Sequence, residues 1–412
     1  MKVLPVNRRS LLALSAALLV PRAAVAEASD DAFLDEIERA SFRFFWDQAA
    51  PATGQVKDRA RAEGADTYKA SSIAATGFGL TALCIADRRG WLAPSEIRDR
   101  VRVTLRFVYE SLAQVHGFFF HFVDMHSGER LWKCELSSID TALLLCGVLT
   151  CRQHFASDSE IPLLAARIYE RVDWPWMLNG GETLSMGWMP ESGFLKARWD
   201  HYCELMMLYL LGMGSPTHPL KASAWSAWRR PQVSFFEENY ISGAPTLFTH
   251  QYSHAWFDFR KRRDAYADYF ENSVKATRAH QKFCVSQGYS EDLWGVSASD
   301  SPNGYVAWGG PPAEGPIDGS VVPCAAGGSI PFLPEETIRV LRRCRAQGWC
   351  RYSFVDAFNP RTGWRNLDVL GIDLGITMLM AENHRSGFVW DTFMKNPEVW
   401  RGMQMAGFVA VG

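Results

Sequence analysis

Residues 138–148 have the sequence Ser-Ile-Asp-Thr-Ala-Leu-Leu-Leu-Cys-Gly-Val, and this stretch decides the fold. Taken as a helix, residues 139–148 are apolar on every side, and a helix that is apolar all round must be buried. Asp140, the charged residue of the stretch, stands in its opening turn. A carboxyl at that place is either satisfied inside the fold or directed into a cavity.

The same arrangement occurs twice more along the chain. Glu204 lies in a predicted apolar helix over 199–211, just before the run 205–211, and Asp373 directly precedes the apolar run 374–380. The loops between the three acids are rich in Trp and Tyr, whose flat faces suit sugar rings as well as apolar cores. Three acidic helix openings and these aromatics together predict a carbohydrate-cleaving pocket.

Helical periodicity dominates the rest of the chain. Nearly apolar helices are predicted at 72–87, 139–148, 199–211 and 374–380, and they alternate with amphipathic or mixed helices, as an inner and an outer ring would. The latter are predicted at 30–48, 94–112, 161–172, 220–236, 261–286 and 335–347. A hairpin is predicted from 117–124 to 130–133. The 287–334 connection is long, so we expect a functional loop or, alternatively, a lid that only covers the core.

Composition and the N-terminus bound the class of protein. The chain has 412 residues and a formal net charge of −2, which gives no indication of nucleic-acid or membrane-surface binding. Arg8 and Arg9, an apolar run over 11–20 and Ala24-Val25-Ala26 predict an export signal over 1–26 and a periplasmic or secreted protein without a membrane anchor. The signal is either of the twin-arginine type or an ordinary secretory one. Residues 27–412 contain no low-complexity linker, so we expect one domain, acting as a monomer.

The sequence gives little evidence for a metal site or a disulfide. Among nine cysteines there is no C-x-x-C spacing, so a zinc site is not expected. His250 and His254 lie four residues apart, but no third ligand has matching spacing, and we interpret them as hydrogen-bonding residues. We therefore predict no metal and no cofactor. Whether Cys344 and Cys350 pair is left open by spacing alone.

Several segments, in order along the chain, resemble the glucoamylase-like domain family. They are SSIAATGFGL at 71–80, RGW at 89–91, SSIDTA at 137–142, GMGSPTHP at 212–219, LFTHQYSHAW at 247–256, WGVSASD at 294–300 and GIDLG at 371–375. The resemblance covers about residues 35 to 390. It implies an all-α (α/α)6 barrel, here with a short β-hairpin and a long aromatic-rich loop, and a ligand site at one end of the central cavity. It also implies glycoside hydrolase chemistry, with several relatives acting on β-1,2-glucan.

Glycoside hydrolysis needs one protonated and one ionised carboxyl group. Apolar neighbours would raise the pKa of Glu204, as a general acid requires, and Glu204 matches the position of the family's proposed acid. Asp373 at a helix start favours the ionised form and suits a base, although Asp is also a common N-cap. Asp140 is a second candidate base or a sugar-binding group. Relatives carry a D-x-x-E pattern near Asp140 that this chain lacks, and Glu135 is expected to supply part of the missing charge.

The candidate sugar-binding residues are aromatic side chains that can stack and polar ones that can bind hydroxyls. They are Trp132, Glu135, Arg198, Trp199, Tyr202, Gln251, His254, Trp294 and Trp308. The leading hypothesis is an exported, inverting hydrolase of β-glucan, most simply of β-1,2-glucan or a related oligosaccharide. The alternatives are a glucan transglycosylase, a non-catalytic periplasmic carbohydrate-binding protein and, fitting the acids less well, a polysaccharide lyase.

Overall fold

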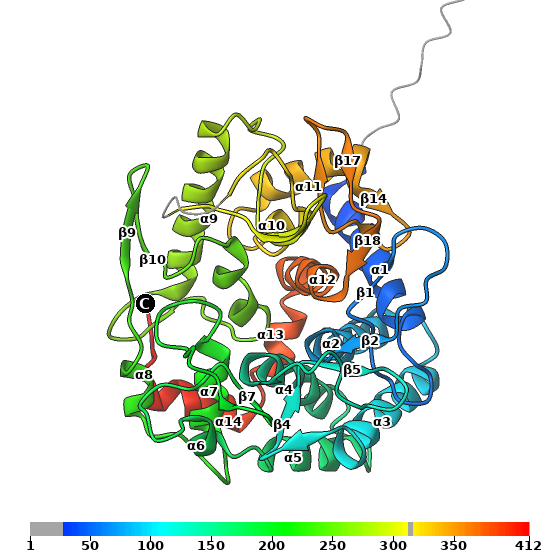
Figure 1. Ribbon diagram of the computed structural model, residues 1–412, viewed down its shortest axis with the longest axis vertical. Coiled ribbons are helices and arrows are strands. Elements are labelled where there is room, and N and C mark those ends of the chain that lie inside the picture. The colour runs from blue at the N-terminus through cyan, green and yellow to red at the C-terminus, as the bar shows by residue number, and fades with distance from the viewer. Residues whose placement is uncertain (1–27, 312–315, 412) are drawn as a thin grey trace, which may run out of the picture.

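The computed structural model describes residues 28–311 and 316–411 of the chain, and within these ranges the protein is built mainly of helices (Figure 1). The predicted export signal lies outside the described residues. The helices are α1 (Asp30–Asp47), α2 (Ile73–Arg89), α3 (Pro94–Glu110), α4 (Ser138–His154), α5 (Ile161–Glu170), α6 (Trp174–Met177), α7 (Met206–Gly214), α8 (Ser223–Ser226), η1 (Leu247–His250), η2 (Tyr252–Ala255), α9 (Tyr269–Ser286), α10 (Pro323–Gly327), α11 (Pro334–Gly348), α12 (Gly371–Ser386), α13 (Phe388–Phe393) and α14 (Pro397–Met405).

The buried helices lie at the centre and the amphipathic ones lie outside them (Figure 1). α2 packs against both α4 and α12, and α12 also contacts α10 and η2, while α4 contacts α7. α1, α3, α5 and α11 pack against these central elements from outside. The cause is the sequence pattern: α4 is buried at every position from Ser138 to Cys151, whereas α3 buries only one stripe.

The central pair α2 and α4 approach so closely because two glycines face each other. A Cβ atom added to Gly77 would lie 2.4 Å from the carbonyl oxygen of Leu143, and one added to Gly147 would lie 2.1 Å from the carbonyl oxygen of Gly77. Neither position can therefore hold a larger residue without moving a helix. The two backbones are in direct contact at this crossing.

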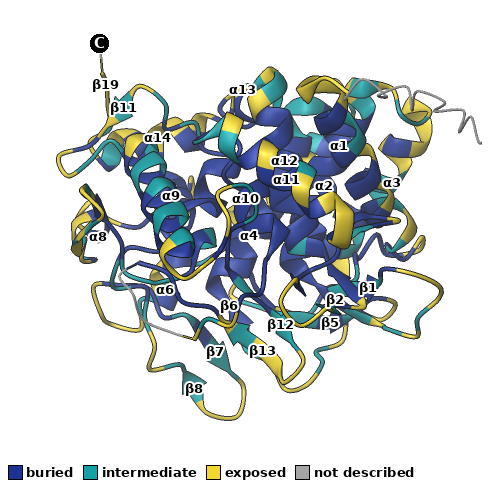
Figure 2. Ribbon diagram, turned by 90° about the horizontal axis from the view of Figure 1, so that it is seen from above, coloured by how far each residue is buried: buried dark blue, intermediate teal, exposed yellow. Residues whose placement is uncertain are grey.

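The strands form small antiparallel sheets, which are mostly pairs. They are β1 (Arg59–Arg61) with β18 (Asp368–Leu370), β2 (Ala70–Ser72) with β5 (Phe122–Asp124), β9 (Gln232–Phe235) with β10 (Glu238–Ile241), β11 (Arg262–Arg263) with β19 (Val409–Ala410), β12 (Ala298–Ser301) with β13 (Gly304–Ala307), β14 (Trp349–Cys350) with β15 (Ser353–Phe354), β16 (Phe358–Asn359) with β17 (Trp364–Arg365), and the five-stranded sheet of β3 (Gln114–Val115), β4 (Phe118–Phe120), β6 (Leu136–Ser137), β7 (Gly187–Met189) and β8 (Gly193–Phe194). Figure 2 shows that β1, β2, β5–β8, β12 and β13 gather at one end of the helices. β2, β6 and β18 lead directly into α2, α4 and α12, so these three helices begin at that end.

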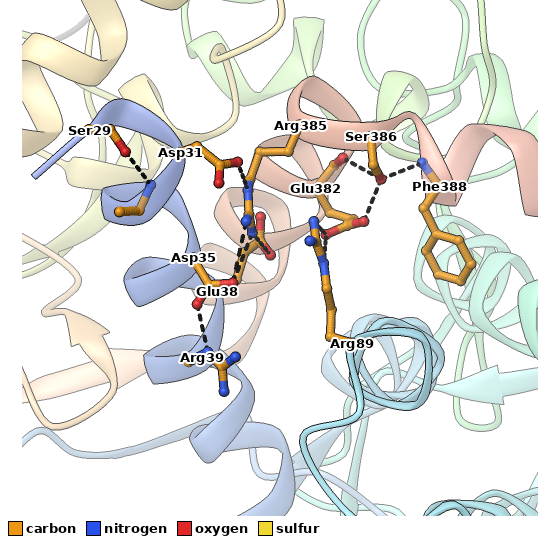
Figure 3. A network of polar contacts seen from close by, with 11 residues as sticks. Ser29, Asp31, Asp35, Glu38, Arg39, Arg89, Glu382, Arg385, Ser386 and Phe388 are labelled. Carbon is orange, nitrogen blue, oxygen red and sulfur yellow. Dashed lines mark hydrogen bonds and ion pairs between the residues drawn. The ribbon is translucent and has the colours of Figure 1, made fainter.

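At the C-terminal ends of α2 and α12, a buried ionic network joins both helices to α1 (Figure 3). Arg385 binds Glu38 at 2.8 Å and Asp31 at 2.7 Å, and Arg89 binds Glu382 at 2.6 Å. The Glu38 side chain has no exposed surface, so its only compensation for lost hydration comes from such partners. This network fixes the helices at the end remote from the strands.

Most predicted helices are present, with three exceptions, two of them in the Trp-rich region. The helix predicted over 261–286 is correct only from Tyr269, because the residues before it form turns and β11. The helix predicted over 199–211 is correct only from Met206, because residues up to Leu205 form turns and an isolated bridge. The helix predicted over 220–236 is wrong: this segment holds the single turn α8 and the strand β9. Its apolar spacing arises instead from Trp225 and Trp228, which pack around the Arg230 guanidinium, 3.4 Å from the Trp228 ring centroid.

The predicted hairpin is also only partly correct. β4 and β5 occupy the predicted outgoing segment, but β5 pairs with β2, and the predicted return is reduced to one bridge between Val123 and Arg130. The long connection after α9 contains the β12–β13 hairpin and α10 rather than an unstructured loop.

All nine cysteines are free, Cys344 and Cys350 included. Across residues 28–311 and 316–411, no helix is long and apolar enough to cross a membrane. Over those residues there is also no cluster of three or more His, Cys, Asp or Glu side chains suited to hold a metal ion.

Candidate active site

The three acids predicted from the sequence line one cavity of about 490 Å³. Asp140 lies in the first turn of α4, Asp373 in the first turn of α12, and Glu204 in the turn before α7. Since α4 and α12 begin where the small strands gather, Asp140 and Asp373 stand at the strand end of these helices (Figure 2). The other walls come mainly from aromatic and aliphatic side chains, namely Phe122, Ile139, Leu143, Phe248, Tyr252, Tyr305, Leu370 and Ile372.

Asp140 is held by its helix cap and faces a histidine. Ser137 is the N-cap of α4: its Oγ accepts the Asp140 N–H at 3.2 Å and donates to Asp140 Oδ2 at 2.5 Å. His121 Nε2 lies 3.6 Å from the same carboxyl oxygen, and His121 Nδ1 lies 3.0 Å from Glu135 Oε1. Burial lowers the pKa of His121, but the charges of Asp140 and Glu135 outweigh it and raise that pKa to about 9. An imidazolium between two carboxylates therefore stands in the wall at neutral pH.

Glu204 is a carboxyl with an elevated pKa. Burial and, to a smaller extent, the nearby charge of Asp140 raise the pKa of Glu204 to about 7, against hydrogen bonds from its own backbone and from Cys203 that lower it. The turn that carries it is fixed because Ser253 Oγ donates to the Glu204 carbonyl at 2.7 Å and accepts the Met207 N–H at 3.1 Å. Such a group is partly protonated at neutral pH, which is the condition a general acid needs.

Asp373 has a second carboxyl behind it, which the sequence did not indicate. Burial and the charge of Asp356 together raise the pKa of Asp373 well above its ordinary range. Asp356 itself is buried, accepts the Asp300 N–H at 2.8 Å and Asn366 Nδ2 at 2.7 Å, and has a pKa raised to about 7, chiefly by burial. Two buried carboxyls in contact cannot both ionise easily, so they share a proton at neutral pH.

This finding differs from the expectation that a helix N-terminus keeps Asp373 ionised. The N-cap of α12 is Leu370, so Asp373 does not act as a cap, and its Oδ2 has no hydrogen-bond partner among the described residues. Desolvation and the neighbouring Asp356 outweigh the helix dipole, whose effect is limited to about 1 kcal/mol. Asp373 nevertheless lines the cavity.

Two further charged residues reach the cavity from β1. Arg59 pairs with Asp58 through Nε at 3.0 Å and with Asp300 through Nη1 at 2.6 Å. β1 runs antiparallel to β18 with Arg59 opposite Leu370, which places this ion pair beside the start of α12. Because the contacts of Arg59 with Asp300 and Leu370 join residues more than 200 positions apart, no local sequence pattern indicated them.

Most of the predicted sugar-binding aromatics belong to the core instead. Trp294 and Tyr202 are fully buried, and neither lines the cavity. Trp199 donates through Nε1 to Ser138 Oγ at 2.8 Å, and Trp308 donates to Ser299 Oγ at 2.8 Å. Their indole N–H groups are thus satisfied within the protein, and these Trp side chains support the cavity wall rather than form it.

The polar side chains predicted to bind sugar hydroxyls also form hydrogen bonds within the protein. Gln251 donates to the Ala325 carbonyl at 2.9 Å, and His254 Nε2 lies 3.1 Å from Ser273 Oγ. Burial lowers the pKa of His254 to about 3, so it is neutral, as is His250 for the same reason. Arg198 donates to the Leu178 carbonyl at 2.7 Å and closes a turn. Of the predicted set, Glu135 reaches the site through His121, and Trp132 lies outside the cavity, exposed to solvent.

Known proteins similar to this chain are named as glucan-cleaving enzymes. Residues 196–397, which carry Glu204, Asp356 and Asp373, match the family model described as "Glycoamylase: Putative glucoamylase". A curated relative from Parabacteroides distasonis is 27% identical over 91% of this chain. The chain is thus similar to the glucoamylase-like family over residues 196–397. That relative is named an exo β-1,2-glucooligosaccharide sophorohydrolase (non-reducing end), and the chain spans 58% of its length.

Solved structures of this family are similar throughout the fold. An endo-β-1,2-glucanase from Chitinophaga pinensis, solved with sophorotriose and glucose, has a TM-score of 0.86 and 27% identity, covering 93% of this chain and 99% of that one. A protein from Bacteroides uniformis described as a putative glucoamylase has a TM-score of 0.87 and 26% identity, covering 93% and 98%. These values extend the likeness to nearly all of the described chain, including residues before 196.

Proposed function

We propose that the protein is a glycoside hydrolase that cleaves β-1,2-glucan or its oligosaccharides. The observation that carries this proposal is the convergence of Glu204, Asp140 and Asp373 on one cavity with apolar walls. Glu204 is the general acid in this proposal, because its elevated pKa leaves a proton available for the leaving oxygen. Asp140, whose charge is balanced by the His121 imidazolium, and Asp373 are the candidates for activating water.

The linkage is taken from the relatives. The sophorohydrolase and the endo-β-1,2-glucanase described above are both named for action on β-1,2-linked glucose, although one is exo-acting and the other endo-acting. We propose an inverting reaction, in which a water molecule stands between the base and the anomeric carbon.

The arrangement of helices supports a more specific architecture. The elements α2, α4, α7, η1–η2, α10 and α12 alternate along the chain with α1, α3, α5, α8, α9 and α11, and we propose that they form the inner and outer rings of an (α/α)6 barrel. We also propose export to the periplasm or beyond, supported by the sequence from Arg8 to Ala26.

The test is hydrolysis of a panel of linear β-1,2-, β-1,3-, β-1,4- and α-linked glucans, with products resolved by length and by anomer. We expect release of short β-1,2-linked products as the α-anomer, which an inverting enzyme forms first from a β-glucan. Products of the same β-configuration would refute inversion. Failure to cleave any member of the panel would refute the proposed hydrolysis itself.

A further inference from the structure

A second cavity adjoins the candidate active site. It also has a volume of about 490 Å³, and Asp58 and Arg59 line both cavities. Its other walls come from the segment before β2, from the start of β18 and from the loop between β5 and β6. The ion pair of β1 is therefore the partition between the two cavities.

Trp132 forms the outer wall of the second cavity and is unusually exposed. Its exposed fraction is 70%, the highest among the large hydrophobic residues that the structure describes. Trp132 and Lys133 have φ angles of 53° and 52°, a left-handed pair that costs about 1 kcal/mol or more per residue. Exposed apolar surface and backbone strain are both unfavourable for folding alone, and at Trp132 they coincide with the wall of a cavity, which points to a functional use for this turn.

The turn is rigid rather than loose. Arg130 donates through Nη2 to the Lys133 carbonyl at 2.7 Å and pairs through Nη1 with Glu191 at 2.6 Å. The Cys134 N–H donates to the Leu131 carbonyl at 3.0 Å across the turn. Trp132 is thereby presented in a fixed position, and a ligand that stacks on it pays little ordering entropy.

The two cavities share a continuous aromatic surface. The ring of Trp132 lies 5.2 Å from that of Phe122, with an interplanar angle of 59°, and Phe122 lines the candidate active site. A chain of linked rings that leaves the active site over Phe122 therefore meets Trp132 next. Alternating flat apolar faces and polar edges are what a glucan offers to such a surface.

The charges of the second cavity favour a neutral ligand. Asp58, Asp124 and Asp368 stand against Arg59 and Lys69, so neither sign dominates. The Tyr68 hydroxyl donates to Asp368 at 3.2 Å, and Asp124 accepts two backbone N–H groups of its own turn. The wall thus offers both donors and acceptors to hydroxyl groups, and it lacks the excess of positive charge that an anionic glycan would need.

We propose that the second cavity is a distal subsite, which binds glucose units of the same glucan chain beyond those held beside Glu204. Trp132 is the stacking platform of this subsite and makes the protein favour longer chains. This inference rests on the proposed function for the identity of the ligand, but not for the existence of the site.

The test compares Trp132→Ala with wild type on β-1,2-glucooligosaccharides of increasing length. We expect kcat/KM to fall roughly tenfold on long chains, since loss of one aromatic anchor costs on the order of 1.4 kcal/mol, and to stay within about twofold on the shortest cleaved substrate. The loss should appear in KM. Trp132→Phe should restore most of the preference for long chains.

Phe236→Ala is the matched control. Phe236 is also an exposed aromatic, at 45%, in a turn with positive φ, yet it lines neither cavity. This variant should leave the length dependence unchanged. If Trp132→Ala reduces kcat/KM equally at all lengths, or at none, the distal subsite is refuted while the hydrolase proposal survives.

A different set of results is expected if the protein does not hydrolyse glucan. If the wild type cleaves no glucan of the panel, binding of the same oligosaccharides is measured by isothermal titration calorimetry. Loss of affinity for long chains in Trp132→Ala, but not in Phe236→Ala, then supports the subsite on a protein that only binds glucan. Equal affinities, or no binding by the wild type, overturn it.

Discussion

Glu204→Gln should abolish turnover and yet stabilise the protein at alkaline pH. The folded-state pKa of Glu204 is about 7, compared with 4.5 for an ordinary glutamate, so the folded state binds this proton more tightly than the unfolded state. Wild type therefore loses stability as pH rises from about 4.5 through about 7. Complete ionisation of Glu204 costs the folded state about 3 kcal/mol, at 1.36 kcal/mol per pKa unit. Less than about 1 kcal/mol of this cost is present at pH 5. Glutamine has nearly the same shape and does not ionise, so the variant avoids this cost.

The assay is urea unfolding at pH 5 and pH 8, followed by the fluorescence of the 16 tryptophans. The free energy of unfolding of Glu204→Gln, relative to wild type, should increase by about 2 to 3 kcal/mol between these pH values.

Activity provides the second half of this prediction. Turnover of β-1,2-glucan should fall about 10²- to 10⁴-fold in Glu204→Gln, the usual contribution of general acid catalysis, and an aryl glycoside with an acidic phenol as leaving group should lose much less. Wild-type kcat/KM should decline above about pH 7. A pH-independent stability difference, together with equal losses on both substrates, would show that Glu204 is an ordinary carboxylate and would refute its role as the acid.

Three further predictions concern the surroundings of the site and the remote end of the helices. Asp356→Asn should lower the pKa of Asp373, because it removes the adjacent like charge, and should move the acidic limb of the pH–activity profile downward; an unchanged profile would mean that the two carboxyls do not share a proton. The His121 ring should titrate near pH 9 by NMR in wild type and closer to 6.5 in Glu135→Gln; an ordinary value in wild type would contradict the imidazolium described above. Burial and the adjacent Glu382 raise the pKa of Glu38 well above its ordinary value, so Arg385→Ala should cost about 3 to 5 kcal/mol in urea unfolding at alkaline pH, where Glu38 is ionised, and less as pH falls through that raised pKa; a loss that does not change with pH would show that Arg385 does not act by compensating the Glu38 charge.

Much of the helical framework could be predicted because it is encoded locally. α1, α3, α5 and α11 follow from apolar spacing on one face, and α4 from its lack of any polar face. The segment 220–236 was predicted wrongly because the same spacing arose from a cluster around Arg230. Helical spacing cannot distinguish side chains that face a core from those that surround a cation.

The residues of the candidate site also fall into two groups, those with a local sequence signal and those placed only by tertiary contacts. Glu204, Asp140 and Asp373 were recognisable because each is an acid beside an apolar helical run, a local signal. His121, Asp356 and Arg59 act through partners brought close only by tertiary contacts, so their sequence neighbourhoods carry no such signal. The sequence could not show that Trp199, Trp294 and Trp308 are buried while Trp132 is exposed, since an aromatic-rich sequence looks the same whether its rings fill a core or bind a ligand.

The glycine contact between α2 and α4 has a consequence for the chemistry. Gly147 lies seven residues, or about 10 Å, along α4 from Asp140, and Gly77 stands at the start of α2. An added methyl group at either position would wedge the two helices apart and so displace one carboxylate relative to the others. Substrate cleavage should therefore be sensitive to side-chain volume at positions that no sugar touches. The absence of a side chain at Gly77 and at Gly147 therefore helps to set the distance between the carboxyl groups of the proposed active site.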